Sequence, residues 1–421
     1  KRGVFKAWTI MLAIFTFALS LLGTFLVRSG VITSVHSFAA DPTRGLFILV
    51  ILGVVIGGGL AMFAWRGWRL TQESHYQLKS RETLLVINNV IILVATIVVV
   101  LGTLYPMIAD AFKLGQVSVG APYFNALFVP LTWLLLLVLG LGPVSRWKRD
   151  TRPFLGVSLA ILASSFVLAA IISYVLTHSM MLNIIMSAAL SLWVLVWIVA
   201  DIKDKTRHAP SLVKGLRRLN MGYWGMQLAH LGILLVVVGI AITTSTSIEK
   251  DVAMTEGETV QVQGYDFTLV DFRQVRGPNY DASQAVVKVS KDGKQITSLL
   301  PEKRHYVVSQ MPMTEASIHY NPMRDVYMAL GEPILEGNQT EANATKWAVR
   351  IYVKPAVRWI WWGSFVIALG AVISMFDKRY RKVGRNRLLN VSDNVADNQE
   401  PTVVSVFNEK VVNDTISIDK A

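Results

Sequence analysis

The chain has 421 residues, of which 53% are hydrophobic and 16% are charged, and its net charge is +13. Soluble domains average about 25% charged residues, so this composition argues against an ordinary cytosolic enzyme. The chain has no cysteine, which excludes disulfide frameworks, thiolate metal sites, cysteine nucleophiles and thioether-linked cofactors within it.

Eight runs of about 20 apolar residues dominate the sequence. A helix of this length crosses the ~30 Å core of a bilayer. Eight such runs are too many for the buried core helices of a soluble protein. The sequence therefore predicts an α-helical polytopic membrane protein with transmembrane helices at 8–27, 46–65, 84–104, 125–144, 154–176, 181–200, 223–244 and 359–376.

The distribution of Lys and Arg predicts the orientation of these helices. If the first helix starts in the cytoplasm, the cytoplasmic segments hold 23 of the 41 Lys and Arg residues, and the short outer loops hold only Arg28, Arg44 and Lys113. Cytoplasmic loops of membrane proteins carry such an excess. The net positive charge is therefore a topology signal, and we expect no nucleic-acid partner.

The segment between the last two spans differs in character from the spans. Apolar and polar residues alternate at 265–269 and 347–353, which is typical of strands. The segments 285–290 and 295–300 flank Asp292-Gly293, a pair that tolerates the positive φ angles of a type I′ hairpin. We therefore predict a small β-rich domain outside the membrane.

The predicted organisation has four parts. A membrane domain with seven transmembrane helices covers 1–244, and the outer β-rich domain covers 245–356. The eighth transmembrane helix covers 357–377. The polar remainder, 378–421, shows little periodicity and is expected to be a disordered cytoplasmic tail.

His230 is the histidine that falls within a predicted span. Ionisable groups at such depth are costly and are candidates for function. On the same helix Gly225, Gly232 and Gly239 recur every seven residues, a smooth stripe that would admit another helix or a flat cofactor. Two interpretations stay open: a histidine hydrogen-bonded to a neighbouring helix, or a neutral imidazole that ligates a metal such as haem iron.

His36 lies in an apolar outer loop just beyond the first predicted span. This loop could lie on lipid, or it could dock a hydrophobic ligand while Arg28 or Arg44 pairs with carboxylates such as haem propionates. The other histidines fall in loops or in the outer domain and are expected to be solvated: His75, His178, His208, His305 and His319.

Several longer motifs occur in a characteristic order. They are Leu21-Leu22-Gly23-Thr24-Phe25-Leu26-Val27-Arg28-Ser29-Gly30-Val31, Ser34-Val35-His36-Ser37-Phe38-Ala39, Asp41-Pro42-Thr43-Arg44-Gly45, Ser80-Arg81-Glu82-Thr83, Asn88-Asn89, Leu101-Gly102-Thr103-Leu104, Tyr223-Trp224-Gly225-Met226, Ala229-His230-Leu231-Gly232, Met313-Thr314-Glu315-Ala316, Arg324-Asp325-Val326-Tyr327 and Arg358-Trp359-Ile360-Trp361. Over about 1–385 the chain resembles the CcmF/NrfE family, the membrane subunit of the bacterial haem lyase.

The resemblance implies a subunit of holocytochrome c synthase in the bacterial inner membrane. Members of the family receive haem from a CcmE-like haem chaperone, act with CcmH/CcmI-like thiol-reducing and apocytochrome-binding subunits, and attach haem to CxxCH motifs of apocytochromes c. It further implies that His36 ligates the iron of a substrate haem at the periplasmic face, and that His230 ligates the iron of a b-type haem within the membrane. Neither residue would be catalytic as an acid, base or nucleophile.

The chain departs from the family pattern in one respect. The tryptophan-rich WWD segment and the first histidine of each haem-binding pair precede Lys1 in the family. We therefore expect a truncated or naturally split protein that needs an N-terminal CcmF part as partner and is incomplete alone. The alternatives are a polytopic membrane transporter and a non-catalytic assembly scaffold, although no internal repeat or buried charge favours a transporter.

Overall fold

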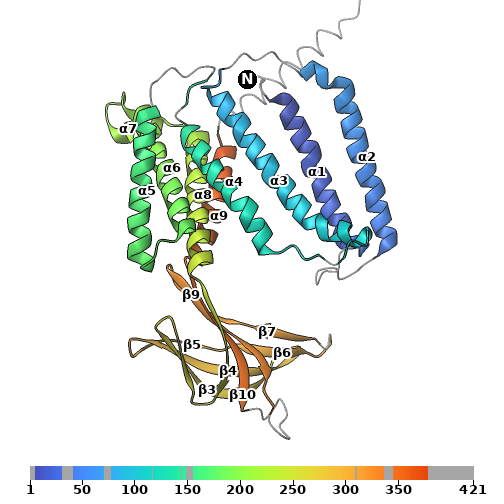
Figure 1. Cartoon of the computed structure of the whole chain (residues 1–421), viewed down its shortest axis with the longest axis vertical. Coiled ribbons are helices and arrows are strands. Elements are labelled where there is room, and N and C mark those ends of the chain that lie inside the picture. Colours follow the sequence, from blue (N-terminus) through green and yellow to red (C-terminus); the bar gives the residue numbers. More distant parts are fainter. Residues whose placement is uncertain are drawn as a thin grey trace, which may run out of the picture. The chain divides into compact units, whose positions relative to one another are not determined.

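The computed structural model describes residues 5–30, 41–70, 77–115, 117–143, 145–147, 155–308, 311–335 and 345–377. Eight helices in these ranges are long and apolar enough to cross a membrane. They are α1 (Lys6–Ser29), α2 (Pro42–Arg66), α3 (Arg81–Ala111), α4 (Ala121–Leu141), α5 (Leu155–Thr177), α6 (Leu182–Thr206), α8 (Met221–Thr246) and α9 (Val357–Met375). The chain is a multi-pass membrane protein, and the predicted fold class is confirmed (Figure 1).

The chain forms two compact units, residues 1–168 with 192–201 and residues 169–191 with 202–421. In the first unit, α1 packs against α2 and α3 packs against α4. The predicted tail at 378–421 and the residues His36 and His75 lie outside the described residues.

The α1–α2 hairpin is closed at one end by Asp41. Its backbone N–H donates to the Arg28 carbonyl at 3.0 Å. Its carboxylate caps α2 by accepting from the N–H groups of Thr43 and Arg44 at 3.1 and 3.2 Å. An acidic N-cap also complements the positive end of the helix dipole. The ends of the loop that carries His36 are thereby held together.

The start of α3 is joined to the end of α4 by the Ser80-Arg81 pair. The Ser80 hydroxyl caps α3 by accepting from the Thr83 N–H at 3.2 Å. The Arg81 N–H donates to the Arg146 carbonyl at 2.8 Å, and the Arg81 guanidinium donates to the Pro143 carbonyl. These hydrogen bonds give partners to backbone N–H and C=O groups that have none within the helices.

The strands between α8 and α9 form two antiparallel sheets. One sheet has the order β1-β10-β9-β8, and the other has the order β2-β3-β4-β6-β7 with β5 paired to β4. The strands are β1 (Ile248–Thr255), β2 (Thr259–Val262), β3 (Tyr265–Arg276), β4 (Tyr280–Lys291), β5 (Lys294–Leu299), β6 (Glu302–Tyr306), β7 (Pro312–Glu315), β8 (Ser317–Tyr320), β9 (Arg324–Pro333) and β10 (Lys346–Pro355).

Alternating residues of the two sheets build one core. On β9, Val326, Met328 and Leu330 are buried, and on β10, Val349 and Ile351 are buried, while the residues between them are more exposed. This is the alternation expected of a sheet with one covered face. Most of the apolar burial in this domain therefore lies between the sheets.

The predicted hairpin is present. Lys291 of β4 pairs with Lys294 of β5, and the two residues between them, Asp292 and Gly293, have φ angles of 50° and 74°. Positive φ at both central positions is the signature of a type I′ turn. The strands predicted at 265–269, 285–290 and 347–353 lie within β3, β4 and β10, and the one predicted at 295–300 overlaps β5, which ends at Leu299.

Three features differ from the predicted elements. The fourth helix begins at Ala121 rather than 125, because Pro122 is favourable in the first turn. The short helix α7 (Leu212–Arg218) and the 3-10 turn η1 (Gly67–Leu70) were not predicted. Both are too short and too basic to show the periodicity on which the predictions rested.

Candidate functional site

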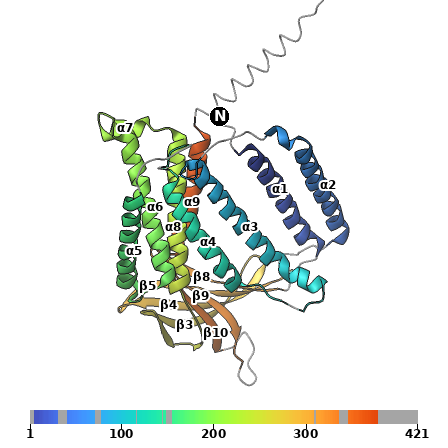
Figure 2. The ribbon, with the colours of Figure 1, turned by 45° about the horizontal axis from the view of Figure 1, so that its top comes forward.

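The glycine stripe of α8 packs directly against α9, and both figures show the two helices side by side (Figures 1 and 2). A Cβ on Gly232 would lie 2.6 Å from the Gly363 carbonyl oxygen, and a Cβ on Gly363 would lie 2.6 Å from the Gly232 carbonyl oxygen. Neither distance is sterically possible, so only glycine permits this approach. The sequence predicted that either another helix or a flat cofactor would pack on this stripe. In the structure α9 packs on it, which leaves no space for a flat cofactor at the glycines.

Hydrogen bonds at both ends fix how α8 and α9 are aligned. The Asp377 carboxylate, which is 2% exposed, accepts from the Gly222 N–H at 2.8 Å at the start of α8. At the other end the Thr243 hydroxyl donates to the Pro355 carbonyl at 2.8 Å. A carboxylate at a helix N-terminus complements both the open N–H groups and the helix dipole. The pair is thus a rigid element on which His230 is mounted.

His230 lies on the opposite face of α8 from the glycine stripe. It stands two positions before Gly232, a rotation of about 200° around the helix. Its own face carries the buried residues Gln227 and Leu234, and its Nδ1 atom is shielded from solvent. His230 follows Met221 by nine residues, which places it about 14 Å along the helix.

His230 is therefore a candidate for one axial ligand of a haem. An imidazole is held on a rigid helix, at membrane depth, on a face that is not closed by the glycine contact. His230 is also the single histidine in the spans that the structure describes. The described residues contain no group of three or more His, Asp or Glu side chains that could hold a metal ion. Of the described residues, His230 is thus the one imidazole that α8 could offer to a metal here.

The structure places the ends of the His36 loop but not His36 itself. Arg44, one of the two predicted carboxylate partners, lies 3.2 Å from the Asp41 carboxylate through its Nε atom. A Cβ on Gly45 would lie 2.8 Å from Ser29, so the ends of α1 and α2 approach closely here. An anion that engages Arg44 must therefore compete with Asp41.

The remaining described histidines lie away from the spans. His178 occupies the turn between α5 and α6 with a φ angle of 51°. His208 follows α6 and accepts a hydrogen bond of 3.0 Å from Arg207. His305 is on β6 and His319 is on β8. None of these positions is one that the sequence analysis assigned to a ligand.

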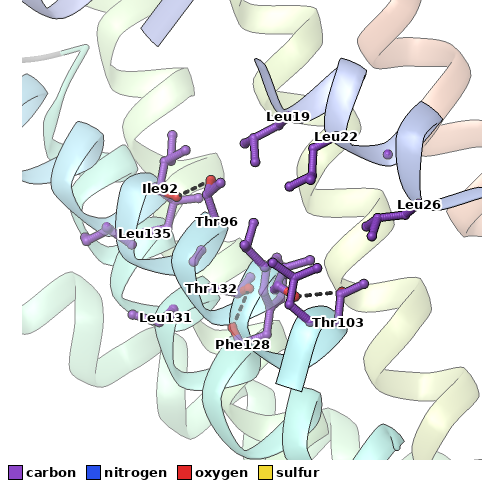
Figure 3. Close-up of a pocket in the computed structure, with 16 residues that line it drawn as sticks. Leu19, Leu22, Leu26, Ile92, Thr96, Thr103, Phe128, Leu131, Thr132 and Leu135 are labelled. Atoms are coloured by element: carbon purple, nitrogen blue, oxygen red, sulfur yellow. Dashed lines mark hydrogen bonds between the residues drawn. The ribbon is translucent and has the colours of Figure 1, made fainter. Parts of the chain in front are cut away.

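A cavity of about 490 Å³ lies between α1, α3 and α4 in the first unit. Leucines of α1 form one wall (Figure 3). Its three hydroxyl residues are Thr96, Thr103 and Thr132, and each donates to a carbonyl of its own helix at 2.7–2.9 Å. Among the described residues, its lining contains no histidine and no charged side chain. The cavity can take an apolar group, and its described walls supply no ligand for a metal.

Sequence reasoning missed Asp377. The residue is an acid at the end of the predicted eighth segment, 357–377, just before a strongly basic segment, and the sequence analysis gives it no role. The sequence does contain one signal for a role of this residue: it is an isolated acid directly before many Lys and Arg residues. Its role depends on α8, 155 residues earlier in the chain, and no local pattern reveals that contact.

Comparisons with known proteins agree on one group of relatives. Residues 245–355 match the CcmF C-terminal beta-sandwich. The chain is 46% identical over 394 residues to the cytochrome c-type biogenesis protein CcmF of Pseudomonas aeruginosa, which covers 92% of this chain and 58% of that protein. It is 43% identical to CcmF of Escherichia coli, with 91% and 57% covered, and 30% identical to NrfE of Haemophilus influenzae, with 91% and 58% covered.

A solved structure, cytochrome c heme lyase CcmF, has the same fold. It superimposes with a TM-score of 0.70 at 21% sequence identity and covers 89% of this chain and 56% of that chain. The chain spans a little under three fifths of the length of the curated relatives it matches. The similarity therefore extends over nearly all of this chain and over part of each relative.

Proposed function

Because this chain belongs to the CcmF family of cytochrome c-type biogenesis proteins, we propose that it is a subunit of a haem lyase, the enzyme that joins haem to apocytochromes c. The observation that carries the proposal is His230, an imidazole mounted at membrane depth on the α8–α9 pair. The proposed location is a bacterial inner membrane, with the β sandwich on the periplasmic side.

His230 would hold the iron of a b-type haem within the membrane. His230 lies on the face of α8 that is turned away from the glycine contact with α9. The hydrogen bonds of Asp377 and Thr243 at the two ends of the pair keep α8 from sliding along α9. An imidazole on so fixed a helix would be kept in one position and orientation, and a haem bound to it would supply the electron-transfer chemistry.

His36 would hold the iron of the substrate haem at the periplasmic face. The loop that carries it leaves α1 beyond Ser29 and rejoins the helix pair at Asp41. Arg28, at the end of α1, is the cation proposed for a propionate because Arg44 is already paired with Asp41. The chain supplies one ligand to each haem, so the second ligands would come from an N-terminal CcmF part.

The reaction is the addition of a thiol across a vinyl group. The sulfur of an apocytochrome cysteine bonds to one vinyl carbon and the hydrogen adds to the other, so no external oxidant is needed. The contribution of this chain is to position the haem. The haem chaperone, the apocytochrome and the thiol-reducing subunit are the proposed partners, and none of these thiols comes from this chain because it has no cysteine.

The test co-expresses this chain with an N-terminal CcmF part and a c-type apocytochrome. The reduced haem spectrum of the purified complex and covalent haem on the cytochrome are measured for the parent, His230→Ala and His36→Ala. We expect His230→Ala to remove the b-type signal and both variants to abolish attachment. His305→Ala, on an exposed position of β6, is the matched control and leaves both readouts unchanged.

Two results contradict the proposal. If both variants keep the parent spectrum and full attachment, the two ligand assignments are wrong. If the chain attaches haem at the parental rate without the N-terminal part, its dependence on ligands from that part is wrong.

A further inference from the structure

One end of the β sandwich joins α8 and α9. β10 continues into α9 through Ala356, and Gln263, in the turn between β2 and β3, donates to the Thr246 carbonyl at the end of α8 at 3.3 Å. Trp359, in the first turn of α9, donates to the Pro322 carbonyl at 3.0 Å. Because α8 and α9 are apolar spans, this end of the sandwich must lie at the membrane surface.

Four cations gather at this end, and we refer to Lys291, Arg324, Lys354 and Arg358 as the basic collar. Two of them lie over the ring of Tyr265, at the start of β3. The Lys291 Nζ atom is 5.4 Å from the ring centroid, and the Arg324 Cζ atom is 5.7 Å from it. The tyrosine is 5% exposed, so its ring is a fixed platform that holds both cations in place.

Lys354 is held by a second aromatic platform. The rings of Tyr327 and Tyr352 are stacked on neighbouring strands with their centroids 4.3 Å apart. The Lys354 Nζ atom lies 5.6 and 5.0 Å from the two centroids. A hydrogen bond with Tyr327 raises the pKa of Lys354, so the ammonium group remains charged at any physiological pH.

The collar has more positive charge than its neighbouring acids neutralise. Arg358 pairs with Asp325 at 3.0 Å. Among the residues that the structure describes, no carboxylate lies within 4.0 Å of the cationic groups of Lys291, Arg324 or Lys354. Tyr320 and Met323 stand beside the collar and are 67% and 63% exposed. Exposed apolar and aromatic side chains next to cations are typical of residues at headgroup depth.

We propose that the basic collar binds the phosphate headgroups of anionic phospholipids, with phosphatidylglycerol as the ligand. The cations are at the membrane surface and carry an excess of positive charge. Fixed rings hold three of them, Lys291, Arg324 and Lys354, without a carboxylate within 4.0 Å among the described residues. Phosphate oxygens supply that counter-charge, and Lys and Arg are the side chains that bind them. Bound headgroups anchor the sandwich to the membrane surface at a defined height.

The test uses the full chain in nanodiscs of equal phosphatidylcholine and phosphatidylglycerol. Native mass spectrometry then counts the lipids of each kind that stay bound after release. The wild-type chain retains phosphatidylglycerol in excess, and Arg324→Gln with Lys354→Gln lowers that preference by about fivefold for each cation removed. Lys354→Gln alone lowers the preference for phosphatidylglycerol by about fivefold. This single variant serves as the test if the double variant folds poorly.

Arg276→Gln with Lys346→Gln is the matched control, because it removes the same charge from the far end of the sandwich. Lys346 and Lys354 lie at opposite ends of β10, eight residues or about 26 Å apart. That separation exceeds the Debye length of about 8 Å at physiological ionic strength. The control retains the wild-type preference, and Arg324→Lys with Lys354→Arg retains most of it.

Four results overturn the proposal. Three of them are an equal loss in the control and the collar variants, no loss in the collar variants, and a wild-type chain without preference for phosphatidylglycerol. If added haemin is retained in place of phosphatidylglycerol with the same dependence on Arg324 and Lys354, the site binds carboxylates of haem instead, and the lipid assignment is also overturned.

Discussion

His230 and Gly232 stand two positions apart on α8 and face opposite sides of the helix. Gly232 packs against Gly363 of α9, whereas His230 lies on the face that carries Gln227 and Leu234. One helix therefore performs two tasks. Its glycine face fixes the position of the helix, and the other face presents the imidazole. Both can be tested separately.

Gly232→Ala is expected to destabilise the chain by about 1–3 kcal/mol, because the added methyl group forces α8 away from the Gly363 carbonyl. The loss is measured as a lower midpoint of thermal unfolding in detergent. Gly57→Ala on α2 is the control, since its Cβ would meet nothing within 4 Å, and we expect it to leave the midpoint unchanged or to raise it. Equal loss in both variants would show that the close approach is not what stabilises the pair.

His230→Ala is expected to lose the b-type haem spectrum in the complex with an N-terminal CcmF part. Added imidazole restores the reduced spectrum, because a free imidazole can occupy the space left by the side chain and ligate iron. The measurement is a titration of the variant with imidazole, followed by absorbance. His178→Asn, in the turn after α5, serves as control. If His230→Ala keeps an unaltered spectrum before imidazole is added, another residue is the ligand.

Asp377→Ala is expected to destabilise the chain by about 1–3 kcal/mol, because the N–H of Gly222 loses the buried carboxylate that accepts its hydrogen bond. The variant is compared with Asp204→Ala, which removes an ion pair of 3.1 Å between side chains that are both more than half exposed. Exposed pairs of this kind contribute about 0–1 kcal/mol. Thermal unfolding of the two variants should therefore differ clearly, and similar midpoints would contradict the role given to Asp377.

Gly293→Ala is expected to destabilise the β sandwich by about 1–2 kcal/mol. Its φ angle of 74° lies in the left-handed region, where a Cβ approaches the following carbonyl oxygen. Asp292→Asn keeps a residue that tolerates this region and should leave stability unchanged. Hydrogen exchange of the β4 and β5 amides measures the effect. Unchanged protection in Gly293→Ala would mean that the turn does not need positive φ.

Acid is expected to weaken the contact between β1 and β10. The hydrogen bond from Arg350 to Asp251 lowers the pKa of the carboxyl below its ordinary value of 3.8. A lowered pKa in the folded state contributes stability above the unfolded pKa, and this contribution is lost as the pH falls through the folded pKa. The difference in unfolding midpoint between the wild type and Asp251→Asn should therefore be constant from neutral pH to about pH 5 and should shrink below about pH 4. A difference that grows as the pH falls would contradict this sign.

The sequence by itself determined the membrane class, the spans and the hairpin turn. Each follows from local chemistry: a charge-free apolar run must be a helix in lipid, and Asp292-Gly293 accepts positive φ angles that few other pairs accept. It also pointed to His230, because an ionisable residue in an apolar run stands out without any knowledge of its neighbours. The ends of α4 and the helix α7 were less predictable, since end positions depend on single capping residues.

Only the tertiary structure decided what the glycine stripe contacts. Periodicity shows that Gly225, Gly232 and Gly239 share a face, and it is compatible with either a helix or a flat cofactor. The occupant is α9, which lies more than 100 residues later in the chain and is brought back by the sandwich. The same holds for Asp377 and for the basic collar, whose members come from β4, β9, β10 and α9. Contacts between residues so distant in sequence depend on the complete fold, and a local sequence pattern cannot predict them.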